Sequence, residues 1–185
     1  MNGRFSVVLA SLALAMLMLP RTAPAQERRV ADGVSRVLAG FTQLTIFDDV
    51  SARVDDGTVT LLGKVTKPYK RDELESRIAR LDGVRGVKNE IGVLPVSAFD
   101  DDLRYRVARA IYGNPSFWNY AAMANPPIHI LVEHGHVTLT GVVNSNVDRM
   151  LARSLATGLG ELSVTNALRT DQEAESFARS LSIRP

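Results

Sequence analysis

The chain has 185 residues, no cysteine, and 22 basic against 20 acidic residues. A chain without cysteine forms no disulfide, uses no thiol nucleophile and lacks the acylated cysteine of a lipoprotein. Nucleic-acid-binding domains usually carry a marked excess of positive charge, so the near balance of charge predicts no nucleic-acid partner.

Residues 1–25 have the features of an export signal. Arg4 lies in a short polar start, a 13-residue apolar run follows from Val7 to Leu19, and Ala23-Pro24-Ala25 supplies a cleavage site of small residues. The apolar run is shorter than the roughly 20 residues that a membrane-spanning helix needs. We therefore expect a signal peptide cleaved after Ala25, a periplasmic location and a mature chain of balanced charge.

The next segment has the pattern of a helix, a hairpin, a second helix and a strand. Apolar residues at helical spacing predict the first helix over 28–40. Alternating apolar residues over 50–54 and 59–65 flank Asp56-Gly57, a dipeptide typical of two-residue hairpin turns. The second helix is marked by apolar residues one turn apart, at Leu74, Ile78 and Leu81. The third strand follows within residues 83–91.

The same order of elements follows a short linker at 95–98, and residues 171–185 form a tail that either makes a brief helix or frays. The second series comprises a helix over 101–112, strands over 128–132 and 137–143, a helix marked by Val147, Leu151 and Leu155, and a strand over 160–168. Seven identical residues recur at an offset of 78 across the two hairpins, from Val54 to Val65 in the first. The offset falls to 77 at the third strand, so we expect one residue to be lost near the turn before the second helix. A duplicated unit favours shared architecture over a unique active site.

The sequence therefore predicts an α+β fold built from two tandem αββαβ units, residues 28–94 and 100–170. Each unit should form a three-stranded mixed sheet with two helices on one face, because a strand–helix–strand crossover packs its helix back on the sheet. A domain of this size buries only about 60% of its unfolded surface, so we expect the two units to pack together.

The repeated motif resembles the BON domain, named for bacterial osmotically induced periplasmic proteins and nodulation proteins. The pattern Gly-x-Val-x-Leu-x-Gly-x-Val begins at Gly57 and again at Gly135, and Gly-Val-x-x-Val-x-Asn begins at Gly83. The second copy departs from the pattern at Glu161 and in a loop five residues longer before its first strand. The resemblance implies an envelope protein whose modules associate with phospholipid membranes or other envelope components, without catalysis.

Four motif residues have structural interpretations. Gly63 and Gly141 share strand parity with the inward apolar residues, and an inward glycine usually lets another backbone or a helix approach closely. Asn89 and Asn166 have the same parity as their apolar neighbours, and a buried amide must be hydrogen-bonded. We expect each asparagine to tie the third strand to a neighbouring loop.

The longer loop of the second unit, residues 112–127, gives two hypotheses for its aromatic residues Phe117, Trp118 and Tyr120. Aromatic side chains with a polar edge favour the headgroup level of a bilayer, so the first hypothesis is that the three insert at a membrane while helix arginines meet anionic headgroups. These arginines are Arg104, Arg106 and Arg109. The alternative is that the loop covers a core edge or the groove between the two units, the commoner fate of large aromatic side chains.

Neither a metal site nor an enzyme is predicted. His129, His134 and His136 lie on one hairpin, but a metal needs three or four converging ligands and the first unit has no matching residues. No motif places a nucleophile beside a base, so we expect no catalysis and no cofactor. The leading hypothesis is a periplasmic protein that binds phospholipid surfaces in envelope or osmotic stress tolerance. The alternative is a soluble periplasmic chaperone or scaffold for client proteins.

Overall fold

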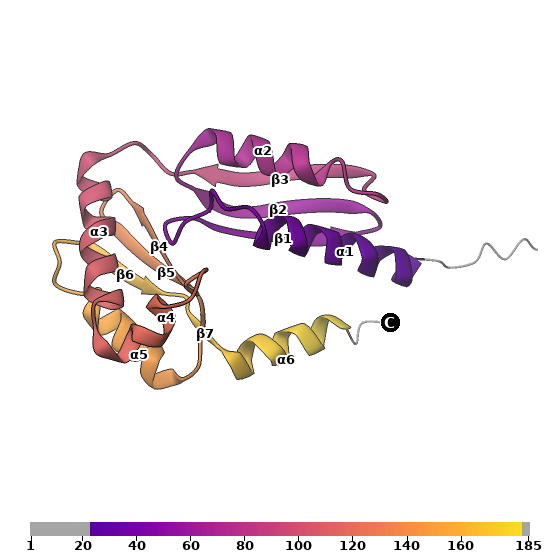
Figure 1. Cartoon of the computed structure of the whole chain (residues 1–185). Helices are drawn as coiled ribbons and strands as arrows, with labels where there is room; N and C mark the ends of the chain where they lie inside the picture. The colour runs from indigo at the N-terminus through magenta and orange to yellow at the C-terminus, as the bar shows by residue number, and fades with distance from the viewer. Residues whose placement is uncertain (1–22, 183–185) are drawn as a thin grey trace, which may run out of the picture.

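The computed structural model describes residues 23–182, and the predicted signal peptide lies almost entirely outside these residues. The first unit consists of one helix, a hairpin, a second helix and a third strand (Figure 1). Its elements are α1 (Ala23–Ala39), β1 (Asp49–Asp55), β2 (Thr58–Val65), α2 (Pro68–Ile78) and β3 (Gly86–Val93). The strand order is β1-β2-β3, antiparallel and then parallel, so the sheet is mixed as predicted.

The second unit repeats this order and adds two short helical turns before its hairpin. Its elements are α3 (Ala98–Tyr112), η1 (Pro115–Phe117), α4 (Trp118–Ala121), β4 (Ile128–Glu133), β5 (His136–Val143), α5 (Asn146–Leu155), β6 (Ser163–Asn166) and β7 (Arg169–Thr170). Both β6 and β7 pair in parallel with β5, at positions that match the single strand β3 of the first unit. They are therefore one interrupted third strand, and the tandem α+β prediction is confirmed. The tail forms helix α6 (Asp171–Ser182).

The local sequence explains where these elements begin and turn. Ser97 and Ser145 cap α3 and α5 by accepting hydrogen bonds from the backbone N–H three residues later. The hairpin turn at Asp56-Gly57 has φ of 44° and 74°, and its counterpart at His134-Gly135 has φ of 52° and 80°. Two successive positive φ angles define the type I′ turn that matches the twist of the flanking strands, as the Asp-Gly dipeptide predicts.

The residue missing from the second unit lies after its second helix, which corrects the prediction that it lies before it. The residues that cap α2 and α5, Lys67 and Ser145, are still 78 apart. The fully buried side chains of these helices also keep this offset, which pairs Leu74 with Ala152 and Ile78 with Ala156. The offset becomes 77 only at the following glycine turns. Apolar residues at helical spacing occur in either alignment, so the pattern alone did not locate the deletion.

This shift changes the face that α5 buries. Of the apolar residues that mark this helix in the sequence, Val147 is 73% exposed, whereas Leu151 and Leu155 are partly buried and pack against the core. The inward positions are held by Ala152 and Ala156. The same core contains Phe117 and Tyr120, large side chains that the longer loop adds to a core whose helix has lost bulk.

The two units pack against each other, as the size of each unit predicted. The backbone N–H of Ile130 on β4 donates to the carbonyl of Ile46 in the first unit at 2.7 Å. The ring of Phe47 meets Tyr105 of α3 edge-to-face, with centroids 5.2 Å apart. Lys64 and Glu133 form an ion pair between β2 and β4. The loop before β1 therefore covers the edge of the second sheet, and α6 extends from the second unit on the side of α1 (Figure 1).

Candidate functional site

The aromatic loop of the second unit divides between the core and the surface. Phe117 is completely buried and Tyr120 is 4% exposed, whereas Trp118 is 75% exposed. The short η1–α4 turn explains the division, because consecutive residues of a helical turn point in different directions. Phe117 and Tyr120 also lie against each other, with ring centroids 5.7 Å apart. The structure thus corrects the hypothesis that all three insert at a membrane, and only Trp118 is placed for such a contact.

Tyr120 also fixes the loop to the start of α5. Its hydroxyl donates to the Asp148 carboxylate at 2.9 Å and accepts from the backbone N–H of Asn144 at 2.8 Å. Burial raises the pKa of Tyr120, and the Asp148 carboxylate raises it further, although the bond from Asn144 acts in the opposite direction. The phenol therefore stays protonated as a donor, and α4 is held firmly beside the first turn of α5.

The first unit has a polar cluster around Asp48, just before β1. Its buried carboxylate accepts from Lys70 Nζ at 2.6 Å, from both the backbone and hydroxyl of Thr45, and from both the backbone and hydroxyl of Thr66. Burial raises the pKa of Asp48, but the Lys70 ammonium and the hydrogen bonds from the two threonines outweigh it and lower that pKa below 3.8. This cluster is structural, because all of its polar atoms bond one another.

The three candidate arginines have different environments. Arg104 is 4% exposed; it donates to the Val132 carbonyl at 2.7 Å and pairs with Asp101. Arg106 is partly buried and bonds the Leu159 carbonyl, so it ties α3 to the loop after α5. Arg109 is exposed in the last turn of α3. Of the three, Arg109 alone is free to meet an external anion without breaking a described structural contact.

Helix α5 presents an apolar face to solvent. Val147 and Met150 are 73% and 71% exposed and lie one turn apart, so they share the outward side of the helix. A surface helix normally turns polar residues outward. Trp118 is exposed on α4, and the Tyr120–Asp148 bond joins α4 to the first turn of α5, which carries Val147. We call Trp118, Val147 and Met150 the α4–α5 patch.

Arginines accompany this patch. Arg153 is exposed on α5, and Arg149 is 31% exposed and pairs with Glu173 of α6 at 3.0 Å. With Arg109, they place positive charge on the helices that carry or adjoin the apolar side chains. An apolar stripe bordered by arginines has the composition of an interfacial helix. The sequence prediction did not include Val147 or Met150 among the candidate site residues, because it used Val147 only to mark the apolar spacing of the helix.

Asp100 is a buried residue whose role the sequence prediction also missed. Its carboxylate accepts from the backbone N–H groups of His134 at 2.9 Å and Gly135 at 2.8 Å. It therefore clamps the first turn of α3 to the β4–β5 turn. The run of three aspartates at residues 100–102 by itself indicates only favourable charge at a helix start. Nothing in the spacing of Asp100 and Gly135, 35 residues apart, indicates this contact.

The two motif asparagines make equivalent structural bonds. Asn89 Nδ2 donates to the Arg71 carbonyl at 3.2 Å, and Asn166 Nδ2 donates to the Arg149 carbonyl at 2.8 Å. Each side-chain oxygen also accepts the backbone N–H two residues later on its own strand. The partner is therefore the second helix of each unit, rather than the loop that was predicted.

The two inward glycines allow a close backbone approach, as predicted. Gly63 and Gly141 have φ of 116° and 111°. A Cβ at Gly63 would lie 2.0 Å from the Asp49 carbonyl oxygen, and one at Gly141 would lie 1.9 Å from that of Pro127. The approaching backbone is that of the first strand of the same hairpin. Glycine is required here by both conformation and space.

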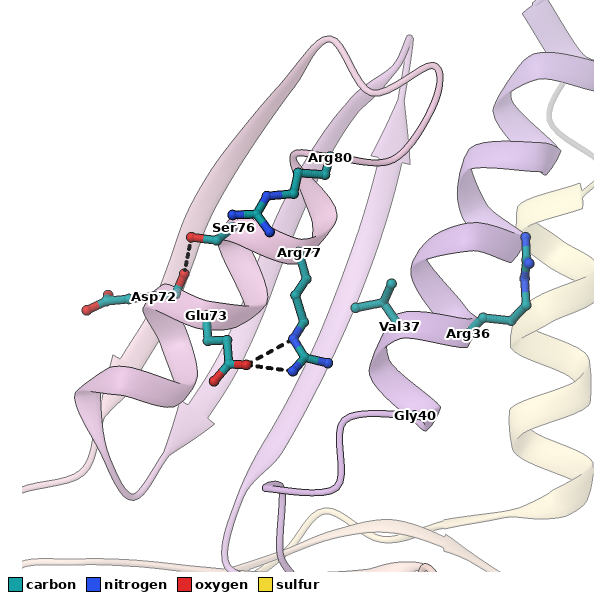
Figure 2. Close-up of a pocket in the computed structure, with 8 residues that line it drawn as sticks. All are labelled: Arg36, Val37, Gly40, Asp72, Glu73, Ser76, Arg77 and Arg80. Atoms are coloured by element: carbon teal, nitrogen blue, oxygen red, sulfur yellow. Dashed lines mark hydrogen bonds and ion pairs between the residues drawn. The ribbon is translucent and has the colours of Figure 1, made fainter.

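A hollow lies between α1 and α2 in the first unit, with a volume of about 860 Å³. Figure 2 shows Arg77 reaching from α2 toward Val37 of α1, while Arg36 points to the other side of α1. The Arg77 guanidinium bonds Glu73 through two nitrogens and lies 5.0 Å from the ring centroid of Phe41. The Arg77 charge is therefore paired with Glu73 within the hollow.

The histidines do not converge. His136 Nδ1 lies 2.7 Å from Ser163 Oγ, and His134 is exposed in the hairpin turn. Among residues 23–182, no three side chains of histidine, aspartate, glutamate or cysteine are placed to hold a metal ion. Over the same range, no helix has both the length and the apolar character needed to cross a bilayer.

No curated protein matches the chain. Two solved structures that are similar to the chain are of CdsD, a structural protein of the type III secretion system of Chlamydia trachomatis. One has 15% identity over 84% of this chain and 98% of that chain, with a TM-score of 0.29. The other, its C-terminal domain, has 12% identity over 75% and 96%, with a TM-score of 0.27. Scores this low support no conclusion about function.

The family model of the BON domain matches residues 28–95 and again residues 100–172, the two units described above. These matches cover most of the chain and agree with the repeated motif, the paired glycines and the common topology of the two sheets. The protein therefore belongs to the BON domain family and carries two tandem BON domains.

Proposed function

We propose that this protein is a non-catalytic periplasmic envelope protein that binds phospholipid membrane surfaces through the α4–α5 patch of its second BON domain. Membership of the BON family supports a binding role, because its members are generally non-catalytic. Such binding serves tolerance to envelope or osmotic stress, and export to the periplasm depends on the leader at residues 1–25.

The observation that carries the proposal is the exposure of the patch. Trp118, Val147 and Met150 are each more than 70% exposed on two helices that the Tyr120–Asp148 bond joins, and a group of exposed large apolar side chains often marks an interaction site. Tryptophan is enriched where a protein meets lipid headgroups. Arg109 and Arg153 give the same region positive charge, which suits anionic headgroups.

The binding should be weak and reversible. Three exposed side chains bury little apolar area, and the cysteine-free chain cannot carry a lipid on a thiol. Electrostatic attraction to anionic lipids adds to the apolar contact and falls with ionic strength. We therefore expect binding to vesicles rich in phosphatidylglycerol at low salt and much less binding to phosphatidylcholine vesicles.

Flotation of the mature protein with liposomes tests the proposal. The double variant Trp118→Ser and Met150→Ser should lose most of its flotation with phosphatidylglycerol vesicles while keeping its melting temperature, because both side chains are exposed. The matched control is Tyr69→Ser, an aromatic that is 52% exposed on α2 of the first domain, and it should float like the wild type. If the wild type stays in the bottom fraction but suppresses aggregation of an unfolded client protein, the chaperone alternative replaces this function.

A further inference from the structure

A second candidate site lies where the two BON domains meet. A cavity of about 470 Å³ is walled on one side by residues 38–50 of the first domain and on the other by residues 124–129 of the second. This volume is within the usual range for small-molecule sites and near its lower end. We call it the seam cavity.

Apolar side chains make most of its wall. The first domain contributes the end of α1 and the loop before β1, and the second contributes the end of the longer loop. The apolar wall includes Leu38, Phe41, Leu44, Ile46, Val50 and Pro126. The hydrogen bond from Ile130 to Ile46 fixes the two walls together at 2.7 Å. The cavity is therefore part of the folded seam and does not depend on movement of a free loop.

One polar group in the wall lacks a partner. His129 lines the cavity, and its Nδ1 is buried without a hydrogen-bond partner among the described residues. A buried polar atom left unpaired costs free energy, so native structures usually supply a protein atom, water or ligand. Imidazole nitrogen can donate or accept depending on the tautomer, so a hydroxyl or an ester carbonyl would satisfy it.

The charges in the wall select against an anion. Asp48 and Asp49 both line the cavity. The Asp48 carboxylate is neutralised by Lys70, but Asp49 adds negative charge at the start of β1. An ionised fatty acid or a phosphate group placed in the cavity would meet this charge, whereas an uncharged polar end would not.

We propose that the seam cavity binds a free single-chain amphiphile with an uncharged polar end, of the class of monoacylglycerols or long-chain alcohols. The aliphatic chain occupies the apolar wall, and the His129 ring turns so that Nδ1, which solvent does not reach in the free protein, bonds the hydroxyl or ester group. The cavity is separate from the α4–α5 patch, so this site does not depend on the membrane-binding function. A two-chain phospholipid has too much bulk and the wrong charge for it.

Isothermal titration calorimetry with soluble probes and no vesicles tests the site. The mature wild-type protein should bind 1-decanoylglycerol saturably at one molecule per chain, and decanoate and dihexanoyl phosphatidylglycerol at least ten-fold more weakly. Equal affinity for the three probes, or no binding of 1-decanoylglycerol, would overturn the proposal. The patch variant Trp118→Ser and Met150→Ser should bind 1-decanoylglycerol like the wild type, which separates this site from the proposed membrane contact.

Two variants locate the ligand. Ala124→Phe adds a ring at an exposed residue on the cavity wall and should abolish binding without unfolding the protein. His129→Phe should weaken 1-decanoylglycerol at least ten-fold while raising the melting temperature of the free protein, because it removes an unpaired buried nitrogen. Thr140→Val is the matched control. Its hydroxyl, opposite His129 on β5, is also buried without a described partner, but Thr140 does not line the cavity. Thr140→Val should leave the affinity for 1-decanoylglycerol unchanged. If His129→Phe also binds 1-decanoylglycerol like the wild type, the assignment of His129 to the site is overturned.

Discussion

The Tyr120 hydroxyl in the second domain takes the structural place of the Asp48 carboxylate in the first. Asp48 accepts the backbone N–H of Thr66, and Tyr120 accepts that of Asn144, the residue 78 positions later. Both side chains come from the loop before the first strand, and both fasten that loop to the residues leading into the second helix. The two loops differ in length and sequence, yet they are held at the same backbone position.

The polarity of the contact is reversed between the domains. In the first, the loop supplies the carboxylate and the helix supplies the ammonium of Lys70. In the second, the loop supplies the phenol and the helix supplies the carboxylate of Asp148, at the position equivalent to Lys70. The two domains therefore hold the same backbone position with different pairs of side chains.

Replacement of Lys70 by methionine should destabilise the first domain strongly. The Lys70 side chain is 5% exposed and that of Asp48 is fully buried, so the variant leaves a carboxylate without its ammonium. Loss of one partner of a buried ion pair costs about 3–5 kcal/mol. Urea unfolding measures the effect. Lys88→Met, which removes an exposed pair with Glu90, should cost at most about 1 kcal/mol, and a similar cost for both variants would contradict this account.

The two domains should lose stability at opposite ends of the pH scale. The pKa of Asp48 is lower in the folded state than its ordinary value, so its contribution is complete above about pH 4 and is lost as pH falls through the folded-state pKa. Burial raises the pKa values of Tyr112 and Tyr120, so their contribution is complete below about pH 10 and is lost as pH rises further.

Melting temperature measured from acid to alkaline pH checks both signs. Asp48→Asn should flatten the acid side of the profile and leave the alkaline side unchanged. The double variant Tyr112→Phe and Tyr120→Phe should do the reverse. Parallel profiles for the wild type and either variant would show that these groups do not set the pH dependence.

The sequence predicted the hairpins and the topology because their signals are local. An Asp-Gly dipeptide between two alternating segments specifies a type I′ turn almost alone, and the duplication showed that the pattern was not accidental. The sequence did not decide which stripe of α5 is most deeply buried, because Leu151 and Leu155, or Ala152 and Ala156, both give an apolar stripe. Only packing decides between them, and it depends on where one residue was deleted.

The candidate site was predictable only in part. The aromatic loop stood out by its composition, but which of Phe117 and Trp118 turns inward is decided by a three-residue helical turn that no periodicity marks. The clamp from Asp100 to the β4–β5 turn and the pair of Asp48 with Lys70 join residues far apart in sequence. Such contacts leave no spacing signal in a single chain.

Alanine at Gly63 should unfold or severely weaken the first domain. A Cβ there would lie 2.0 Å from a backbone oxygen, and φ is 116°, so neither space nor conformation allows a side chain. We expect a loss above about 3 kcal/mol. Gly86→Ala is the control, because nothing lies within 4 Å of its Cβ position, and its melting temperature should stay close to that of the wild type. Equal effects of the two variants would refute the close approach.

Serine at Phe117 and serine at Trp118 should have opposite consequences. Phe117 is fully buried, so Phe117→Ser should cost about 3–5 kcal/mol through lost packing and a buried hydroxyl. Trp118 is 75% exposed, so Trp118→Ser should leave stability nearly unchanged. Thermal unfolding of the two variants measures the difference. A large stability loss in Trp118→Ser would place that ring in the core.

Trp118 is the only tryptophan in the chain, so its fluorescence reports membrane contact directly. With the mature protein at low salt, phosphatidylglycerol vesicles should shift its emission to shorter wavelengths, and brominated acyl chains in those vesicles should quench it. Phosphatidylcholine vesicles should have little effect. An emission spectrum that stays unchanged while the protein floats with vesicles would contradict binding through the α4–α5 patch.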